Sequence, residues 1–88
     1  MDWKAQFSVE ANRQFAKLDR PAQVRLAKFI KTRINTDENP RRIGEALKGR
    51  FGEYWKYRVG NYRLICDIED ATHTVFVLQI GDRKEVYR

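Results

Sequence analysis

The chain has 88 residues, of which 42% are hydrophobic, 12% aromatic and 34% charged. That length suits a single domain, residues 1–88, and the composition is too apolar for a disordered chain. Eighteen Lys and Arg against twelve Asp and Glu give a formal net charge of +6, which favours contact with polyanions. The N-terminus lacks the apolar core of a signal peptide and no run is long enough to cross a bilayer, so we expect a cytoplasmic protein.

The chain holds a single cysteine and a single histidine. Cys66 lies in an apolar run, so an internal disulfide is impossible, and we expect its side chain to be buried. His73 falls near a turn, where we expect it to be solvated. One residue of each type disfavours a His-based nuclease and a His/Cys metal site, so we expect no metal and no cofactor.

The N-terminal part predicts a strand followed by a helical hairpin. Residues 3–8 form a short segment that ends at Ser8, a capping residue, which predicts an edge strand with Trp3 and Phe7 facing the core. The helix that Ser8 begins runs to Asp19, where Pro21 signals the start of a second helix. The apolar stripe of this second helix consists of Ala22, Leu26, Phe29, Ile30 and Ile34.

The C-terminal part changes to an alternating pattern. Residues 35–40 are rich in turn formers, and we expect residues 41–48 to form a short turn of helix. Three segments rich in aromatic and β-branched residues then predict consecutive strands at 53–59, 62–69 and 74–80. The predicted fold is α+β, with an N-terminal strand, a two-helix hairpin and a three-stranded antiparallel meander whose helices cover one sheet face.

A two-residue loop, Gly60-Asn61, fixes the register of the first two meander strands. Arg58 is then opposite Arg63, and Lys56 lies on the same face, which we expect to be open. Opposed like charges cost a few tenths to about 1 kcal/mol. The cations are therefore either a solvated surface screened by salt or a phosphate site whose occupant relieves the repulsion.

The cation-rich segment and the C-terminal tail add to this cluster. Residues 41–63 carry seven cations and two anions, which is a net charge of +5. Gly81 ends the last strand and lets the backbone turn, so that Arg83 and Tyr87 approach the cluster. Taken alone, the tail is weak evidence, because a terminal arginine and tyrosine are more often an exposed charge and a packed ring than parts of a site.

At these residues the chain resembles the RelE/ParE superfamily of toxins from toxin-antitoxin systems, and its RelE-like branch in particular. The resemblance covers essentially the whole chain. It is carried by Leu47-Lys48-Gly49, Lys56-Tyr57-Arg58, Asn61-Tyr62-Arg63-Leu64, residues 75–77, Ile80-Gly81-Asp82-Arg83 and Glu85-Val86-Tyr87. It implies a RelE-like microbial RNase fold and a ribosome-dependent endonuclease that cuts mRNA in the decoding site.

The resemblance also assigns the site. The catalytic set is Lys56, Arg58, Arg63, Arg83 and Tyr87, and Lys48 and Arg50 are further RNA-binding cations. RNA carries its own nucleophile, the 2′-hydroxyl, so the protein has to align it, remove its proton and neutralise the phosphorane, without a metal. We expect Arg63 and Arg83 to hold the phosphate, Tyr87 or Lys56 to take the proton, and Arg58 or Arg83 to assist the leaving oxygen.

Two departures from the RelE-like pattern stand out: the hairpin is about two residues shorter, and arginine occupies position 58, where lysine is frequent. Arginine cannot act as a base at neutral pH, so the base is Tyr87 or Lys56. The expected partners are an acidic antitoxin and the ribosome with its mRNA. Two other functions stay open: a ParE-like inhibitor of DNA gyrase and an RNA-binding module without catalysis.

Overall fold

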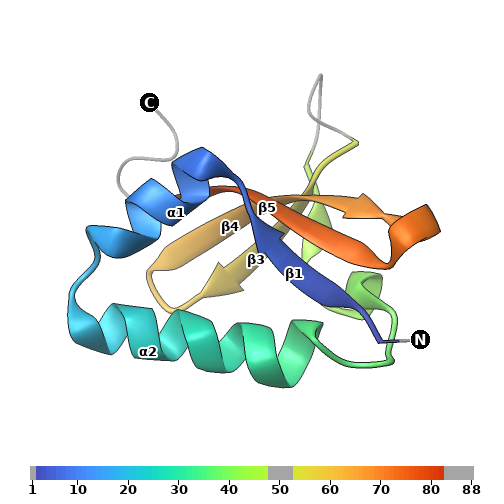
Figure 1. The fold of residues 1–88 in the computed structure, drawn as a ribbon, viewed down its shortest axis with the longest axis horizontal. Coiled ribbons are helices and arrows are strands. Elements are labelled where there is room, and N and C mark those ends of the chain that lie inside the picture. The colour runs from blue at the N-terminus through green and yellow to red at the C-terminus, as the bar shows by residue number, and fades with distance from the viewer. Residues whose placement is uncertain (1, 48–52, 83–88) are drawn as a thin grey trace.

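The fold is α+β, as the sequence predicts, and packs two helices against a sheet of five strands, one more than predicted (Figure 1). The computed structural model describes residues 2–47 and 53–82. The elements are β1 (Lys4–Phe7), α1 (Val9–Ala16), α2 (Arg20–Phe29), a π-helical turn (Ile30–Ile34), a 3₁₀ turn (Pro40–Arg42), β2 (Glu45–Ala46), β3 (Trp55–Val59), β4 (Tyr62–Glu69), a 3₁₀ turn (Asp70–Thr72) and β5 (Thr74–Asp82). No helix in the described ranges has the length and apolar content that crossing a membrane requires.

Capping side chains set the starts of both helices. Ser8 Oγ accepts a hydrogen bond from the amide of Ala11 at 3.0 Å, and Asp19 Oδ1 accepts one from the amide of Ala22 at 3.0 Å. Each bond satisfies a donor that the first helical turn leaves without an intrahelical acceptor. Pro21 lies in the first turn of α2, where it sacrifices no hydrogen bond. Both predicted helix starts are confirmed.

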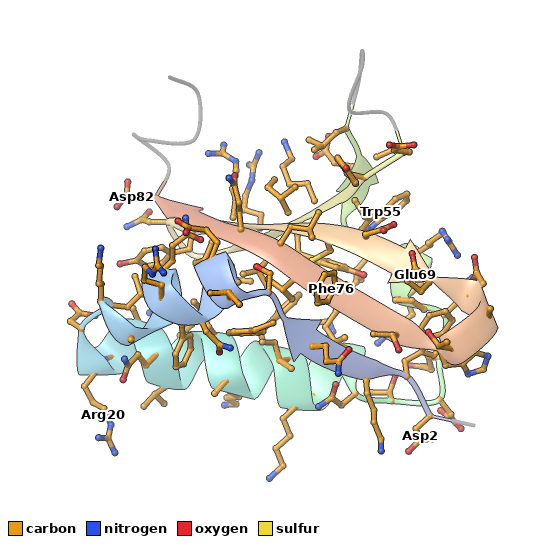
Figure 2. The ribbon with its side chains drawn as sticks, turned by 45° about the horizontal axis from the view of Figure 1, so that its top comes forward. Asp2, Arg20, Trp55, Glu69, Phe76 and Asp82 are labelled. Atoms are coloured by element: carbon orange, nitrogen blue, oxygen red, sulfur yellow. The ribbon has the colours of Figure 1, made fainter. Side chains whose placement is uncertain are left out.

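The sheet has the strand order β1-β5-β4-β3-β2. β3, β4 and β5 form the predicted antiparallel meander, and β1 lies at one edge, parallel to β5, with Lys4 opposite Thr74. α1 and α2 carry the chain from β1 to β2 at the opposite edge of the sheet, and the meander of β3, β4 and β5 then returns it to β1. A bulge between Ile65 and Cys66 interrupts the pairing of β4 with β5. Figure 2 shows both helices on one side of the sheet and side chains rising from the other side.

The hydrophobic core fills the space between the helices and the sheet. Its buried members are Trp3, Ala11, Leu26, Ile34, Tyr57, Val59, Leu64, Cys66, Val75, Val77 and Ile80, with Phe7, Phe29 and Ile30 partly buried against it. The predicted apolar stripe of α2 and the predicted burial of Cys66 are confirmed, and burial raises the pKa of the Cys66 thiol. The Tyr57 hydroxyl donates to the carbonyl of Pro40 at 2.6 Å, which ties the connector to the core.

The connector before β3 differs from the prediction. Among residues 41–47, the described part of the predicted helical turn, only Arg41 and Arg42 are helical, in the 3₁₀ turn Pro40–Arg42, and the chain then turns at Gly44, with φ of +79°, into β2. β2 pairs with β3 and places Glu45 opposite Lys56. A two-residue strand is too short to show alternation in a sequence, and it forms here because the edge of β3 supplies its hydrogen bonds.

Replacing Ser8 with alanine should lower the free energy of unfolding by about 1–2 kcal/mol. The change removes the cap of α1 and also the hydrogen bond that Ser8 Oγ donates to the carbonyl of Leu78 at 2.8 Å. Asp19→Ala removes only a cap, so it serves as the control and should cost about 1 kcal/mol. Urea unfolding compares the two variants, and equal losses would show that the bond to Leu78 contributes no stability.

Candidate nucleic-acid interface

The β3–β4 hairpin carries the cationic cluster in the predicted register. Gly60 has a φ of +60°, which a tight two-residue turn requires and glycine adopts without strain. Arg58 is opposite Arg63. Lys56 is opposite Ile65, and this second pair lies two residues further from the turn, on the same sheet face. Directly opposed side chains have Cβ atoms about 4.5–5.5 Å apart, so positive charge is concentrated at this end of the sheet.

The three cations differ in exposure, which the alternation of the strands does not predict. Arg58 is exposed and Lys56 is half-buried, whereas Arg63 is only 6% exposed and its Nε and Nη1 atoms are buried. Arg63 lies opposite Arg58, as expected, but the expectation that its side chain is open to solvent is wrong. A guanidinium stays protonated when it is buried, so Arg63 still contributes a fixed positive charge.

A small hollow lies between the arginines and the turn. Arg58, Gly60, Asn61, Tyr62 and Arg63 line it, and its volume is about 20 Å³. That volume is enough for one water-sized group, such as a single phosphate oxygen. Two arginines and the polar turn therefore border a space that a small, negatively charged atom fits.

Two other cations of the basic segment have structural roles. Arg41 forms a bidentate ion pair with Asp70, with both N···O distances at 2.9 Å, and this hydrogen bonding lowers the pKa of the Asp70 carboxyl. Arg42 forms an ion pair with Glu38 at 3.2 Å and donates to the carbonyl of Arg33. These arginines hold the connector in place, so the net charge of residues 41–63 overstates what is available to a ligand.

Four of the expected site residues lie outside the described residues: Lys48, Arg50, Arg83 and Tyr87. β5 is described as far as Asp82, and it passes beside the cluster, because Gly81 is opposite Arg63. The sequence continues from Asp82 directly into Arg83. The structure thus brings together Lys56, Arg58 and Arg63, and the roles of the other four remain predictions.

The opposite end of the same sheet face is acidic, which the sequence analysis missed. A hollow of about 460 Å³ is lined by Gln6, Asp67, Glu69, Thr72, Thr74 and Phe76. The hydrogen bond between Asp67 and Glu69 and the repulsion of their charges raise the pKa of the Glu69 carboxyl. The labelled Glu69 and Phe76 can be followed in Figure 2. The alternation of β4 would have predicted this acidic end, because Asp67 and Glu69 share the sheet face of Arg63.

Replacing Asp67 with asparagine should bring the pKa of Glu69 down towards its ordinary value, because the neighbouring charge is removed. A raised carboxyl pKa means that the folded state binds the proton more tightly, so this contribution to stability is present at low pH and is lost as pH rises through the folded pKa. Carboxyl NMR titration measures the change. Asp70→Asn is the control, for which we expect a smaller change in the pKa of Glu69. An unchanged pKa of Glu69 in Asp67→Asn would show that Asp67 is not the cause of the shift.

His73 lies at a turn, as predicted, but it is only partly exposed. Its ring stacks on Trp3, with centroids 4.6 Å apart and planes 3° from parallel, and its backbone is left-handed with φ of +51°. It ends the turn between β4 and β5, where its carbonyl accepts from the amide of Lys4 at 3.0 Å. Within residues 2–47 and 53–82, no three His, Cys, Asp or Glu side chains form a group that could hold a metal ion.

Fold and site together define a small α+β protein with a cationic β-hairpin, open to a polyanion at one end of its sheet. The family model described as ParE toxin of type II toxin-antitoxin system, parDE, matches residues 5–87. The chain therefore belongs to the ParE toxin family, within the RelE/ParE superfamily, and is a toxin of a type II toxin-antitoxin system.

Individual relatives agree with this assignment. Toxin RelG of Mycobacterium tuberculosis is 28% identical over 88 residues, covering 100% of this chain and 99% of that protein. The toxin-antitoxin complex RelBE2 of the same organism contains a chain with a TM-score of 0.84 and 25% identity, covering 97% of this chain and 95% of that one. The isolated RelE toxin of E. coli has the same fold, with a TM-score of 0.71 and 24% identity, covering 97% of this chain and 90% of that one.

Proposed function

We propose that this toxin is a ribosome-dependent endonuclease that cuts mRNA through the 2′-hydroxyl without a metal ion. The observation that carries the proposal is the hairpin register, which sets Arg58 opposite Arg63 and Lys56 beside them. Opposed like charges weaken a hairpin, so a folding requirement does not select this pair. A bound phosphate offsets the repulsion, because guanidinium groups donate to its oxygens in planar, bidentate geometry.

The proposed chemistry uses the three positioned cations and the two C-terminal residues of the expected set. Arg63 and Arg83 neutralise the charge that builds on the phosphorane, and Arg58 or Arg83 stabilises the leaving 5′-oxygen. Tyr87 or Lys56 removes the proton of the 2′-hydroxyl. Arg58 is not the base, because arginine keeps its proton at neutral pH.

The proposed substrate is mRNA that the ribosome presents, with Lys48 and Arg50 as further RNA contacts. The acidic end of the sheet face, around Asp67 and Glu69, repels phosphates. It therefore favours binding of the RNA at the hairpin end of the face. The proposed site of action is the cytoplasm, and the proposed protein partner is an acidic antitoxin. The mycobacterial relative in a toxin-antitoxin complex and the net charge of +6 support that partner.

A second candidate function is inhibition of DNA gyrase, and the observation that favours it is the match to a model named for ParE. ParE-like toxins share this fold and do not depend on a Lys/Arg/Tyr cluster. The pairing of Arg58 with Arg63 favours RNA cleavage over this alternative, because a gyrase inhibitor has no use for a phosphate site on the hairpin.

A cell-free translation reaction with purified toxin separates these functions. We expect stalled ribosomes with mRNA cut at codons in the decoding site, and unchanged supercoiling in a parallel gyrase reaction. Intact mRNA with accumulated gyrase-cleaved DNA would establish the ParE-like function instead. Intact mRNA and unaffected gyrase, with RNA still bound, would identify a binding module without catalysis.

A further inference from the structure

A row of side chains crosses the open sheet face directly beside the arginine pair, Arg58 and Arg63. Ile65 is the middle of this row, with Lys56 opposite it on β3 and Gln79 opposite it on β5. Ile65 lies two residues along β4 from Arg63, which is about 7 Å, and it shares the same face because side chains alternate along a strand. A phosphate and the base of the same nucleotide are separated by a similar distance. A nucleotide held by its phosphate at the arginine pair therefore reaches this row with its base.

Ile65 offers an apolar surface that the fold does not use. It is half-buried, and it is not among the described side chains that pack against the hydrophobic core. Its neighbours along the strand, Leu64 and Cys66, are core residues on the other face of the sheet. The faces of a nucleobase ring are apolar, so contact between a base and Ile65 removes apolar surface of both from water. Ile65 is therefore a platform on which a base can lie.

Gln79 places hydrogen-bonding groups beside that platform. Two other glutamines use their amides within the fold. Gln14 Oε1 accepts a hydrogen bond from the amide of Ile80 at 2.6 Å, and Gln23 Nε2 donates one to the carbonyl of Phe15 at 3.0 Å. Gln79, in contrast, is exposed, and its side-chain amide makes no hydrogen bond within residues 2–47 and 53–82. Its donor and its acceptor are therefore available to a ligand.

We infer that Gln79 selects the base beside the cut bond and that it favours adenine. The inference rests on the proposed function, which holds the cut phosphate at the arginine pair, and it adds which base lies next to it. Gln79 is the last side chain of β5 on this face before the arginine pair, since Gly81, opposite Arg63, carries none. An amide presents one donor and one acceptor side by side. Adenine matches that pattern with N6 and N7, whereas guanine presents two acceptors on the same edge.

The test is an NMR titration of the full chain with the 3′,5′-bisphosphates of the four ribonucleosides. We expect the adenosine compound to bind about fivefold more tightly than the others and to shift the side-chain amide signal of Gln79. Inorganic phosphate should leave that signal in place, because it lacks a base. Gln79→Glu should change the preference to guanosine, since a carboxylate only accepts hydrogen bonds and guanine alone carries two adjacent donors, N1–H and N2–H.

Gln6→Glu is the matched control, because Gln6 is exposed on the same sheet face and lies opposite Phe76, at the acidic end. It should keep the preference for adenosine, and thermal melting should show both variants folded. Equal affinities of the four nucleotides for the wild type, or the same change of preference in both variants, would overturn the inference. Failure of mRNA cleavage by the wild-type chain would instead contradict the proposed function, and it would leave the nucleotide result unaffected.

Discussion

Arg63→Met is expected to reduce ribosome-dependent mRNA cleavage by about a hundredfold or more. Methionine keeps most of the side-chain volume at a position that is 6% exposed, but it removes the charge and the donors. Loss of one preorganised donor to a developing oxyanion typically costs about 10²–10³ in rate. The cleavage rate of Arg63→Lys should lie between those of Arg63→Met and the wild type, because lysine keeps the charge and loses the planar arrangement of donors. Single-round cleavage on programmed ribosomes measures both.

Arg13→Ala is the control for loss of an arginine in general. Arg13 is exposed on α1 and forms a surface ion pair with Glu10 at 3.8 Å, so we expect cleavage within about twofold of the wild type. Thermal melting separates a lost reaction from a lost fold. A folded Arg63→Met protein that cleaves at the wild-type rate would remove Arg63 from the site.

Gly44→Ala is expected to lower the free energy of unfolding by about 2–5 kcal/mol, the largest effect of any single added methyl group that we predict. Gly44 has φ of +79°, and a Cβ there would lie 2.5 Å from the carbonyl oxygen of Lys56 and 2.6 Å from Trp55 Nε1. Relief of these clashes has to displace β2 from β3 or break the bond from Trp55 Nε1 to the carbonyl of Ile43. Urea unfolding measures the loss.

Gly60→Ala separates the clash from the backbone conformation. Gly60 also has a left-handed φ, of +60°, but the nearest atom to an added Cβ is the end of the flexible Arg25 side chain. We therefore expect a smaller loss of about 1–2 kcal/mol, which comes from backbone strain. Losses of the same size at both glycines would show that close contact with β3 does not matter at Gly44.

Local signals predicted the elements that depend on local chemistry. Ser8 and Asp19 cap the helices where their side chains predict, and Gly60-Asn61 sets a register that places Arg58 opposite Arg63. The parallel pairing of β1 with β5 has no local signal, because Lys4 and Thr74 lie far apart in the chain. β2 escaped prediction for the same reason, since the edge of β3 makes a strand of Glu45–Ala46.

The sequence predicted which sheet face carries the candidate site, but not how deeply its side chains are buried. Alternation assigns Lys56, Arg58 and Arg63 to one side of the sheet, and it carries no information about what covers a side chain. The burial of Arg63 therefore appeared only in the structure. The sequence grouped Arg41 with these cations by proximity in the chain, whereas its ion pair with Asp70 joins two turns that are distant in sequence.

The most direct test of the proposed reaction changes one atom of the substrate. Purified ribosomes carry an mRNA in which the nucleotide 5′ to the cut bond lacks its 2′-hydroxyl, and an all-ribose mRNA is the control. The account predicts that the toxin cuts only the control and leaves a 2′,3′-cyclic phosphate, because the 2′-oxygen is the nucleophile. Equal cutting of the deoxy-substituted mRNA would show that water or another nucleophile attacks, and would contradict a reaction through the 2′-hydroxyl.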